Sequence, residues 1–193
     1  MTTTRLTRSE RSALTRSELL DAAERRFFAD GYHGTSLDQI ADDAGYTKGA
    51  VYSTFRSKAG LFLALFDVMA DRRIAEIRAL MSAHDDDEEI VAALARRPVE
   101  EASARFLLLA IEFWVHAAHD PALLEEFSAR HQRLRDGLAQ FAPRSAALTP
   151  ERWAIVTLAL SHGLALERLI DPHGVPDDLM AAVEGRLLDP ATR

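Results

Sequence analysis

Residues 35–58 read TSLDQIADDAGYTKGAVYSTFRSK, and this stretch decides the fold. Ser36 and Gln39 have the spacing of a capping box, in which each side chain bonds a free amide of the first helical turn. Gly45 follows the helical pattern and suits the left-handed backbone at a helix end. A second short helix is expected over residues 47–55. Two short helices joined by a tight turn predict a helix-turn-helix.

The second helix of this pair has two different faces. Val51 and Phe55 are apolar and would pack the helix onto the preceding ones. The other face carries small and polar side chains, which allow a helix to approach base edges in the major groove of DNA. The residues of this face are Lys48, Gly49, Ala50, Tyr52, Ser53 and Thr54. Tyr52 has an alternative interpretation, which is packing against the next helix.

Helical patterns extend over the rest of the chain, and strand patterns are nearly absent. Thr15 and Glu18 have capping-box spacing, which predicts a first helix that begins there and ends near Gly31. Ser57 would cap a long helix that continues to about Leu80. Prolines at first-turn positions predict four further helices, at about 98–119, 121–141, 149–171 and 176–188. The patterns therefore predict an all-α chain with a small N-terminal unit on a larger helical bundle.

The net charge of −7 at first argues against a nucleic-acid partner. The charge is unevenly distributed, because residues 1–58 carry nine Lys and Arg against eight Asp and Glu, whereas residues 59–193 carry 14 against 22. Arg5, Arg8 and Arg11 would form an arm along the minor groove of DNA or remain a solvated tail. The sequence has no cysteine, no apolar signal segment and no apolar run long enough to span a membrane, so a cytoplasmic protein is expected.

The stretch from about Thr15 to Phe66 resembles the DNA-binding domain of the TetR family of repressors. The matching residues are Phe27-Phe28-Ala-Asp-Gly31-Tyr32, Thr35-Ser36, Ile40-Ala41, Ala44-Gly45, Lys48-Gly49, Val51-Tyr52, Phe55 and Lys58-Ala-Gly-Leu61. The C-terminal part shows only the family's all-helical character. The resemblance implies a three-helix helix-turn-helix DNA-binding domain over residues 1–58, with a long helix leading into a ligand-binding and dimerisation domain over residues 59–193.

The resemblance also implies which residues contact double-stranded DNA. Bases would be contacted at the start of the second helix of the motif, by Lys48, Gly49 and Ala50. Phosphates would be contacted at Thr35, Ser36, Tyr52, Thr54 and Lys58, and the predicted set also includes Thr47 and Ser53. Ala50 and Ser53 depart from the family's usual residues, which are a hydroxyl residue and an aromatic residue or histidine respectively.

The C-terminal part carries large apolar side chains at helical spacing, most of them expected in the core and some around an effector. The predicted effector-binding residues are Phe106, Leu109, Glu112, Phe113, His116, Phe127, His131 and Trp153, with His162 as a further polar candidate. Glu112 stands in an otherwise apolar stretch, where burying a lone carboxylate is costly. It would therefore meet a cationic ligand, pair with Arg105 or Arg152, or face solvent.

Two stripes of small and apolar residues near the C-terminus predict a homodimer interface. They consist of Ala159, Gly163 and Leu166 in one helix and of Leu179, Val183 and Leu187 in the next. Packing of these stripes within one chain is the alternative. A two-fold dimer would bind a pseudo-palindromic operator.

Two other classes of function fit the sequence less well. The chain has no nucleophile, phosphate-loop or zinc-protease motif, and His116 and His119 lack a third ligand at matching spacing, so we expect no enzyme, no cofactor and no metal site. An architectural or non-specific DNA-binding protein would need broad positive charge, which the acidic bundle lacks. A ligand-independent regulator remains an alternative, and its affinity for DNA would not change with any effector. The sequence therefore predicts a transcriptional regulator, most commonly a repressor in this family, that a small hydrophobic effector releases from DNA.

Overall fold

The computed structural model describes residues 7–83, 101–142, 148–176, 178–179 and 182–183. Within these residues the chain forms seven helices and no strand, which confirms the all-α fold. In chain order the helices are α1 (Arg8–Gly34), α2 (Leu37–Ala44), α3 (Lys48–Phe55), α4 (Lys58–Ser82), α6 (Glu101–Ala117), α7 (Pro121–Ala139) and α8 (Pro150–Ile170).

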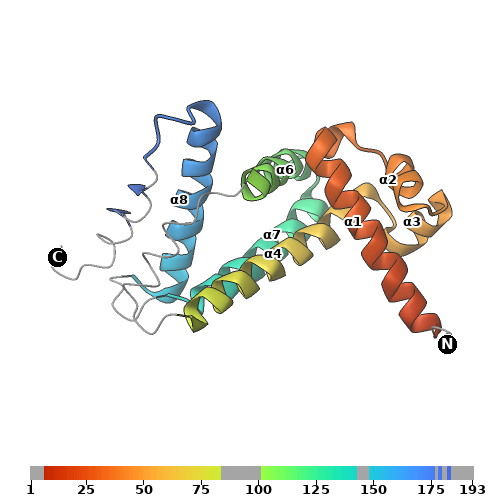
Figure 1. Ribbon diagram of the computed structural model, residues 1–193, viewed down its shortest axis with the longest axis horizontal. Coiled ribbons are helices and arrows are strands. Elements are labelled where there is room, and N and C mark those ends of the chain that lie inside the picture. Colours follow the sequence, from red (N-terminus) through yellow and green to blue (C-terminus); the bar gives the residue numbers. More distant parts are fainter. Residues whose placement is uncertain (1–6, 84–100, 143–147, 177, 180–181, 184–193) are drawn as a thin grey trace.

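The helices form an elongated molecule with a small head at one end (Figure 1). α1, α2 and α3 make the head, and α4 runs from it alongside α7. α6 packs against α1, α7 and α8, so it joins the head to the rest of the bundle. α8 lies at the opposite end from the head and packs on α6 and α7.

The first helix begins earlier than its sequence pattern predicts. Thr7 and Glu10 form the capping box, with the Thr7 N–H donating to Glu10 over 2.7 Å and the Glu10 N–H donating to Thr7 over 3.2 Å. The prediction of a helix start at Thr15 was therefore wrong. No glycine or proline stands between the two positions, so nothing prevents the helix from extending to the earlier box. Glu18 instead accepts a hydrogen bond from the Tyr46 hydroxyl.

The other predicted helix starts agree with the structure wherever it describes them. Ser36 and Gln39 cap α2 reciprocally, and Ser57 caps α4. Asp120 and Thr149 cap α7 and α8, each of which has a proline in its first turn. The expected start at Pro98 and most of the helix expected over 176–188 lie outside the described residues.

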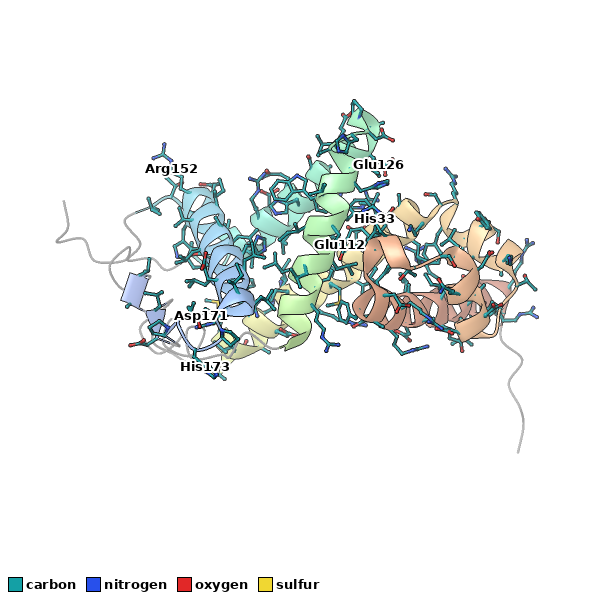
Figure 2. The ribbon with its side chains drawn as sticks, turned by 90° about the horizontal axis from the view of Figure 1, so that it is seen from above. His33, Glu112, Glu126, Arg152, Asp171 and His173 are labelled. Atoms are coloured by element: carbon teal, nitrogen blue, oxygen red, sulfur yellow. The ribbon has the colours of Figure 1, made fainter. Side chains whose placement is uncertain are left out.

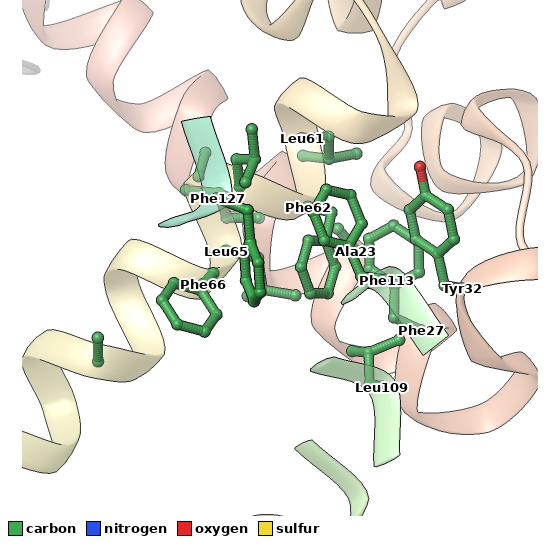
Figure 3. Packing of buried hydrophobic residues seen from close by; sticks show 14 of the residues in the cluster. Ala23, Phe27, Tyr32, Leu61, Phe62, Leu65, Phe66, Leu109, Phe113 and Phe127 are labelled. Atoms are coloured by element: carbon green, nitrogen blue, oxygen red, sulfur yellow. The ribbon is translucent and has the colours of Figure 1, made fainter. Parts of the chain in front are cut away.

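An aromatic cluster joins the head to the bundle (Figure 3). The rings of Phe62 on α4 and Phe113 on α6 are stacked with centroids 4.1 Å apart, and Phe27 on α1 lies 6.0 Å from Phe62. Phe127 on α7 extends the cluster, with its ring 5.4 Å from that of Phe113. Burial of each such ring contributes roughly 1.5–3 kcal/mol. The core is therefore continuous across residue 58, where the sequence suggested a domain boundary.

Candidate nucleic-acid interface

The helix-turn-helix is anchored to α1 by both apolar and polar contacts. Ile40 and Ala41 on α2 are completely buried. The Arg26 guanidinium on α1 donates to both carboxylate oxygens of Asp43, with an Nη2–Oδ1 distance of 2.8 Å. This ion pair keeps the pKa of Asp43 below its ordinary value. α2 is therefore fixed on α1, and the turn that follows it starts from a defined position.

The turn between α2 and α3 depends on one glycine. Gly45 has φ 72° and ψ 25°, and its N–H bonds the carbonyls of Ala41 and Asp42. This left-handed backbone suits glycine because it has no Cβ. Thr47 then caps α3 by accepting a hydrogen bond from the Ala50 N–H. The three residues 45–47 therefore connect α2 to α3 and leave the N-terminus of α3 at the surface.

α3 has the two faces that its sequence predicts. Val51 and Phe55 are buried, at 0% and 5% exposure. Tyr52 is 52% exposed, so it faces outward and is not packed against α4. Thr47, Lys48, Gly49 and Ser53 are also exposed, whereas Ala50 and Thr54 are half-buried.

Several polar groups of α3 are already hydrogen-bonded in the absence of DNA. The Ser53 and Thr54 hydroxyls donate to the Ala50 carbonyl, over 2.9 Å and 2.7 Å. The Lys48 ammonium donates to the Asp38 carboxylate on α2, and this bond raises the pKa of Lys48. Binding of Lys48 to DNA would therefore compete with Asp38.

Two of the predicted phosphate-binding side chains point inward in this structure. Thr35 is 2% exposed, and its hydroxyl donates to the carbonyls of Gly31 and Arg26. The Lys58 ammonium donates to the carbonyls of Tyr32 and Thr35, over 2.8 Å and 2.9 Å. Ser36, in contrast, is exposed at the start of α2. Contacts of Thr35 and Lys58 with phosphate remain predictions.

The head contains basic residues near α3 that the sequence pattern did not single out. The Arg16 guanidinium lies over the Phe55 ring, 4.8 Å from its centroid, and Arg16 is exposed. Arg56, also exposed, follows α3 with φ 66°. No local sequence signal shows that Arg16 lies beside Phe55, because the tertiary fold brings together two residues that are far apart in the sequence. Arg8 and Arg11 belong to the first turns of α1 rather than to an extended arm, and Arg5 lies outside the described residues.

The turn between α3 and α4 holds the two helices close together. The Ser57 hydroxyl accepts a hydrogen bond from the Gly60 N–H over 2.9 Å. A Cβ at residue 60 would overlap the Phe55 carbonyl oxygen, so the close approach requires glycine. The end of α3 is therefore held close to the start of α4.

Six of the predicted effector-binding residues lie inside the bundle or at its edge. Leu109 and Phe113 on α6 are almost fully buried, and Phe127 faces them from α7. Phe106 is half-buried, with its ring 5.8 Å from that of Phe66 on α4. His131 lies at the edge, 6.2 Å from Phe127, and burial lowers its pKa, with Arg135 adding to the shift. Trp153 joins the same core from α8.

The remaining two, Glu112 and His116, lie at the contact between α6 and the end of α1. Figure 2 shows Glu112 on α6 near His33 at the end of α1. Glu112 accepts a hydrogen bond from the backbone N–H of Tyr32 over 2.8 Å. The His116 ring lies 5.2 Å from the Tyr32 ring and 5.7 Å from that of His33. From the sequence, Glu112 was expected to meet a cationic ligand, pair with Arg105 or Arg152, or face solvent. Its hydrogen-bond partner in the structure is instead a backbone amide. This partner comes from 80 residues away and has no signal in the local pattern.

A capped helix-turn-helix with an outward-facing second helix, set on an all-helical bundle, defines a DNA-binding transcriptional regulator. Comparison with known families agrees. The model described as "Bacterial regulatory proteins, tetR family" matches residues 19–65, and the one described as "BetI-type transcriptional repressor, C-terminal" matches residues 83–191. The chain belongs to the TetR family of regulators, and its C-terminal part is of the BetI type.

Relatives are similar over different parts of the chain. The HTH-type transcriptional activator FasR of Mycolicibacterium smegmatis is 38% identical over 91 residues, which are 47% of this chain and 40% of FasR. The regulator TtgR of Pseudomonas putida is 38% identical over 78 residues, 40% of this chain and 37% of TtgR. The chain thus aligns with about two fifths of these two relatives. The HTH-type transcriptional regulator BetI of Burkholderia lata is 28% identical over 185 residues, covering 88% of each chain.

Solved structures share the fold over nearly the whole chain. A TetR-family transcriptional regulator from Rhodococcus sp. superposes with a TM-score of 0.74 at 18% identity, covering 92% of this chain and all of that one. A transcriptional regulator from Saccharomonospora viridis in complex with choline has a TM-score of 0.69 at 18% identity, covering 90% of this chain and 95% of that one. At these identities the likeness shows the fold.

Proposed function

We propose that this regulator is a repressor that binds a pseudo-palindromic operator as a homodimer and is released by a small-molecule effector. The observation that carries the proposal is the exposed face of α3, which presents Lys48, Gly49, Tyr52 and Ser53 outward from a buried Val51 and Phe55. Small and polar side chains on an exposed N-terminal turn fit a major groove. The DNA-binding part would extend over residues 1–58 and the effector-binding and dimerisation part over residues 59–193.

An exposed apolar face on α8 supports the dimer. Ile155 is 47% exposed and Ile170 80% exposed, and Ala159 and Gly163 lie between them on the surface. A Cβ built on Gly163 meets nothing within 4 Å, so a second helix has room to approach closely. Leu166, Leu179 and Val183 are half-buried, and Leu187 lies outside the described residues. Apolar surface of this kind in a regulator suits a two-fold interface.

The length and hydropathy of α8 have a second interpretation. The sequence was expected to hold no apolar run long enough to span a membrane, and α8 corrects this: its mean hydropathy reaches 1.3 and its 21 residues would suffice by length and composition. A helix of a dimer interface has the same composition. Because the comparisons are with DNA-binding regulators, we infer that the protein acts in the cytoplasm and that this face meets a second copy. Sedimentation of the purified protein without detergent, as a species of twice 21.4 kDa, tests that inference.

The aromatic interior of the bundle supports a small hydrophobic effector. Phe106, Leu109, Phe113 and Phe127 come from two helices and face α4 together. Choline is the first specific candidate, because a solved structural neighbour of the same fold is in complex with it. Aromatic rings bind quaternary ammonium groups through their negative faces.

The experiment is fluorescence anisotropy of the full chain on the intergenic DNA upstream of its own gene, with scrambled DNA as competitor at physiological salt. A regulator of this type binds the native fragment with two protomers per site, and addition of its effector weakens the complex. Equal affinity for both DNAs would instead favour the architectural alternative. Tight binding that neither choline nor a set of hydrophobic compounds changes would favour a ligand-independent regulator.

A further inference from the structure

The backbone of Tyr32 is held from two sides by helices of different parts of the molecule. Its N–H donates to Glu112 on α6 over 2.8 Å, and its carbonyl accepts from the Lys58 ammonium at the start of α4 over 2.8 Å. The Lys58 ammonium also lies over the Tyr32 ring, 4.5 Å from its centroid. Tyr32 is only 2% exposed, so neither backbone group has ready access to water as a replacement partner.

The N–H of Tyr32 is available to Glu112 because α1 is interrupted just before it. Gly31 has φ 73° and ψ 175°, which are not helical values. A Cβ at residue 31 would lie 2.9 Å from both carboxylate oxygens of Glu112. Glycine is therefore required at this position for two reasons. Another residue would strain the backbone at this φ, and its Cβ would collide with the Glu112 carboxylate.

The Lys58 ammonium links Tyr32 to the residues just before α2, the first helix of the helix-turn-helix. Besides the Tyr32 carbonyl it bonds the carbonyl of Thr35 over 2.9 Å. Thr35 directly precedes Ser36, the residue that caps α2. Burial lowers the pKa of Lys58, and the Glu112 carboxylate opposes that shift. Glu112 thus acts on this group by charge as well as through Tyr32.

We propose that Glu112 is a positioning residue that couples the effector-binding bundle to the helix-turn-helix, by holding the Tyr32 N–H while Lys58 holds the carbonyls of Tyr32 and Thr35. The proposal rests on the proposed function, because it assigns the route by which that function is regulated. α6 packs on α7 and α8 as well as on α1, so displacement of α6 within the bundle would pull Glu112 away from Tyr32. The end of α1, next to the cap of α2, would then lose its hydrogen bond to α6.

Amide hydrogen exchange tests the proposal directly and needs neither operator nor effector. In Glu112→Ala, we expect the Tyr32 amide to exchange about tenfold faster and the first turn of α2 to lose protection, with α7 and α8 unchanged. Glu112→Gln keeps an acceptor oxygen, so it should restore much of the protection at Tyr32. Glu125→Ala, an exposed carboxylate on α7, is the matched control and should leave the head unaffected.

Anisotropy with the upstream DNA adds the functional readout. Glu112→Ala should weaken binding about tenfold, which corresponds to about 1.4 kcal/mol, and Glu112→Gln should recover most of it. Unchanged exchange at Tyr32 and α2 in Glu112→Ala would overturn the proposal, as would a uniform loss of protection over the whole chain that Gln does not rescue. If no variant binds the DNA, the proposed function fails, while the exchange data still decide whether Glu112 holds the head.

Discussion

The Glu112 carboxylate on α6 accepts a 2.8 Å hydrogen bond from the backbone N–H of Tyr32, 80 residues earlier in the chain. This contact has a consequence for the neighbouring glycine. Gly31→Ala would add strain of about 1 kcal/mol for the positive φ, and its Cβ would also crowd the carboxylate. We expect a total loss of about 2–3 kcal/mol in the free energy of unfolding, measured with urea. In a Glu112→Ala background the cost should fall to about 1 kcal/mol. An equal cost in both backgrounds would contradict the crowding.

The two turns that flank α3 should respond differently to alanine. At Gly45 the φ is 72° but a Cβ meets nothing within 4 Å, so Gly45→Ala should cost only about 1 kcal/mol of unfolding free energy. At Gly60 a Cβ would overlap the Phe55 carbonyl oxygen, so Gly60→Ala must displace the start of α4. We expect a loss of about 2–4 kcal/mol there. Chemical denaturation of both variants checks the order, and a more harmful Gly45→Ala would refute this account of the turns.

The pH dependence of stability should reflect a half-buried histidine on α8, His162. Burial lowers the pKa of His162 to about 4, and His131 adds to the shift. An unfolded chain has a histidine pKa of about 6.5, so the unfolded state takes up the proton first as the pH falls. The stability contributed by neutral His162 is present above about pH 6.5 and is lost between there and about pH 4.

His162→Gln should remove that part of the acid sensitivity. We expect the difference in unfolding free energy between pH 7.5 and pH 4.5 to be smaller in the variant by on the order of 1–3 kcal/mol. Urea titrations of both proteins at the two pH values measure it. The same acid sensitivity in both proteins would mean that His162 is not held neutral in the folded chain.

The ion pair between Lys48 and Asp38 should restrain DNA binding. Asp38→Asn frees the ammonium and removes a negative charge beside the DNA-facing helix, so affinity for the upstream DNA should rise, by about two- to fivefold. Lys48→Ala should instead weaken binding. Anisotropy at several salt concentrations separates the two roles of Lys48. A salt slope reduced by about one indicates a phosphate contact, and relaxed specificity at one base pair indicates a base contact. Weaker binding by Asp38→Asn would show that the carboxylate supports the interface.

The local features of the fold were largely predictable from the sequence. The cap of α2 by Ser36 and Gln39 and its end at Gly45 depend on neighbouring residues only, and the structure has both. The starts of α7 and α8 follow from a proline after a capping residue for the same reason. The start of α1 was missed because the chain holds two capping boxes on one uninterrupted helical pattern, and the earlier one is used.

The partners of charged side chains could not be predicted in this way. Glu112 was recognised as unusual because it interrupts an apolar stretch, but its partner is a backbone amide that is freed by the turn at Gly31. Lys58 is an equivalent case, since its hydrogen bonds depend on how α1 and α4 meet. Such contacts are set by tertiary packing, and a single sequence carries no periodic signal for them.

Gly49→Glu shows whether α3 contacts the bases of the operator. Gly49 is exposed, and a Cβ there meets only Thr47 Oγ1 at 3.9 Å, so the substitution leaves room for the fold while placing a carboxylate on the reading face. Ser128→Glu, on the exposed surface of α7, is the control for added charge. The measurement is the ratio of affinities for upstream and scrambled DNA. We expect this ratio to fall toward one in Gly49→Glu, with no change in the free energy of unfolding, and to keep its wild-type value in Ser128→Glu. An undiminished ratio in Gly49→Glu would mean that α3 does not make the specific contact and that it lies elsewhere on the molecule.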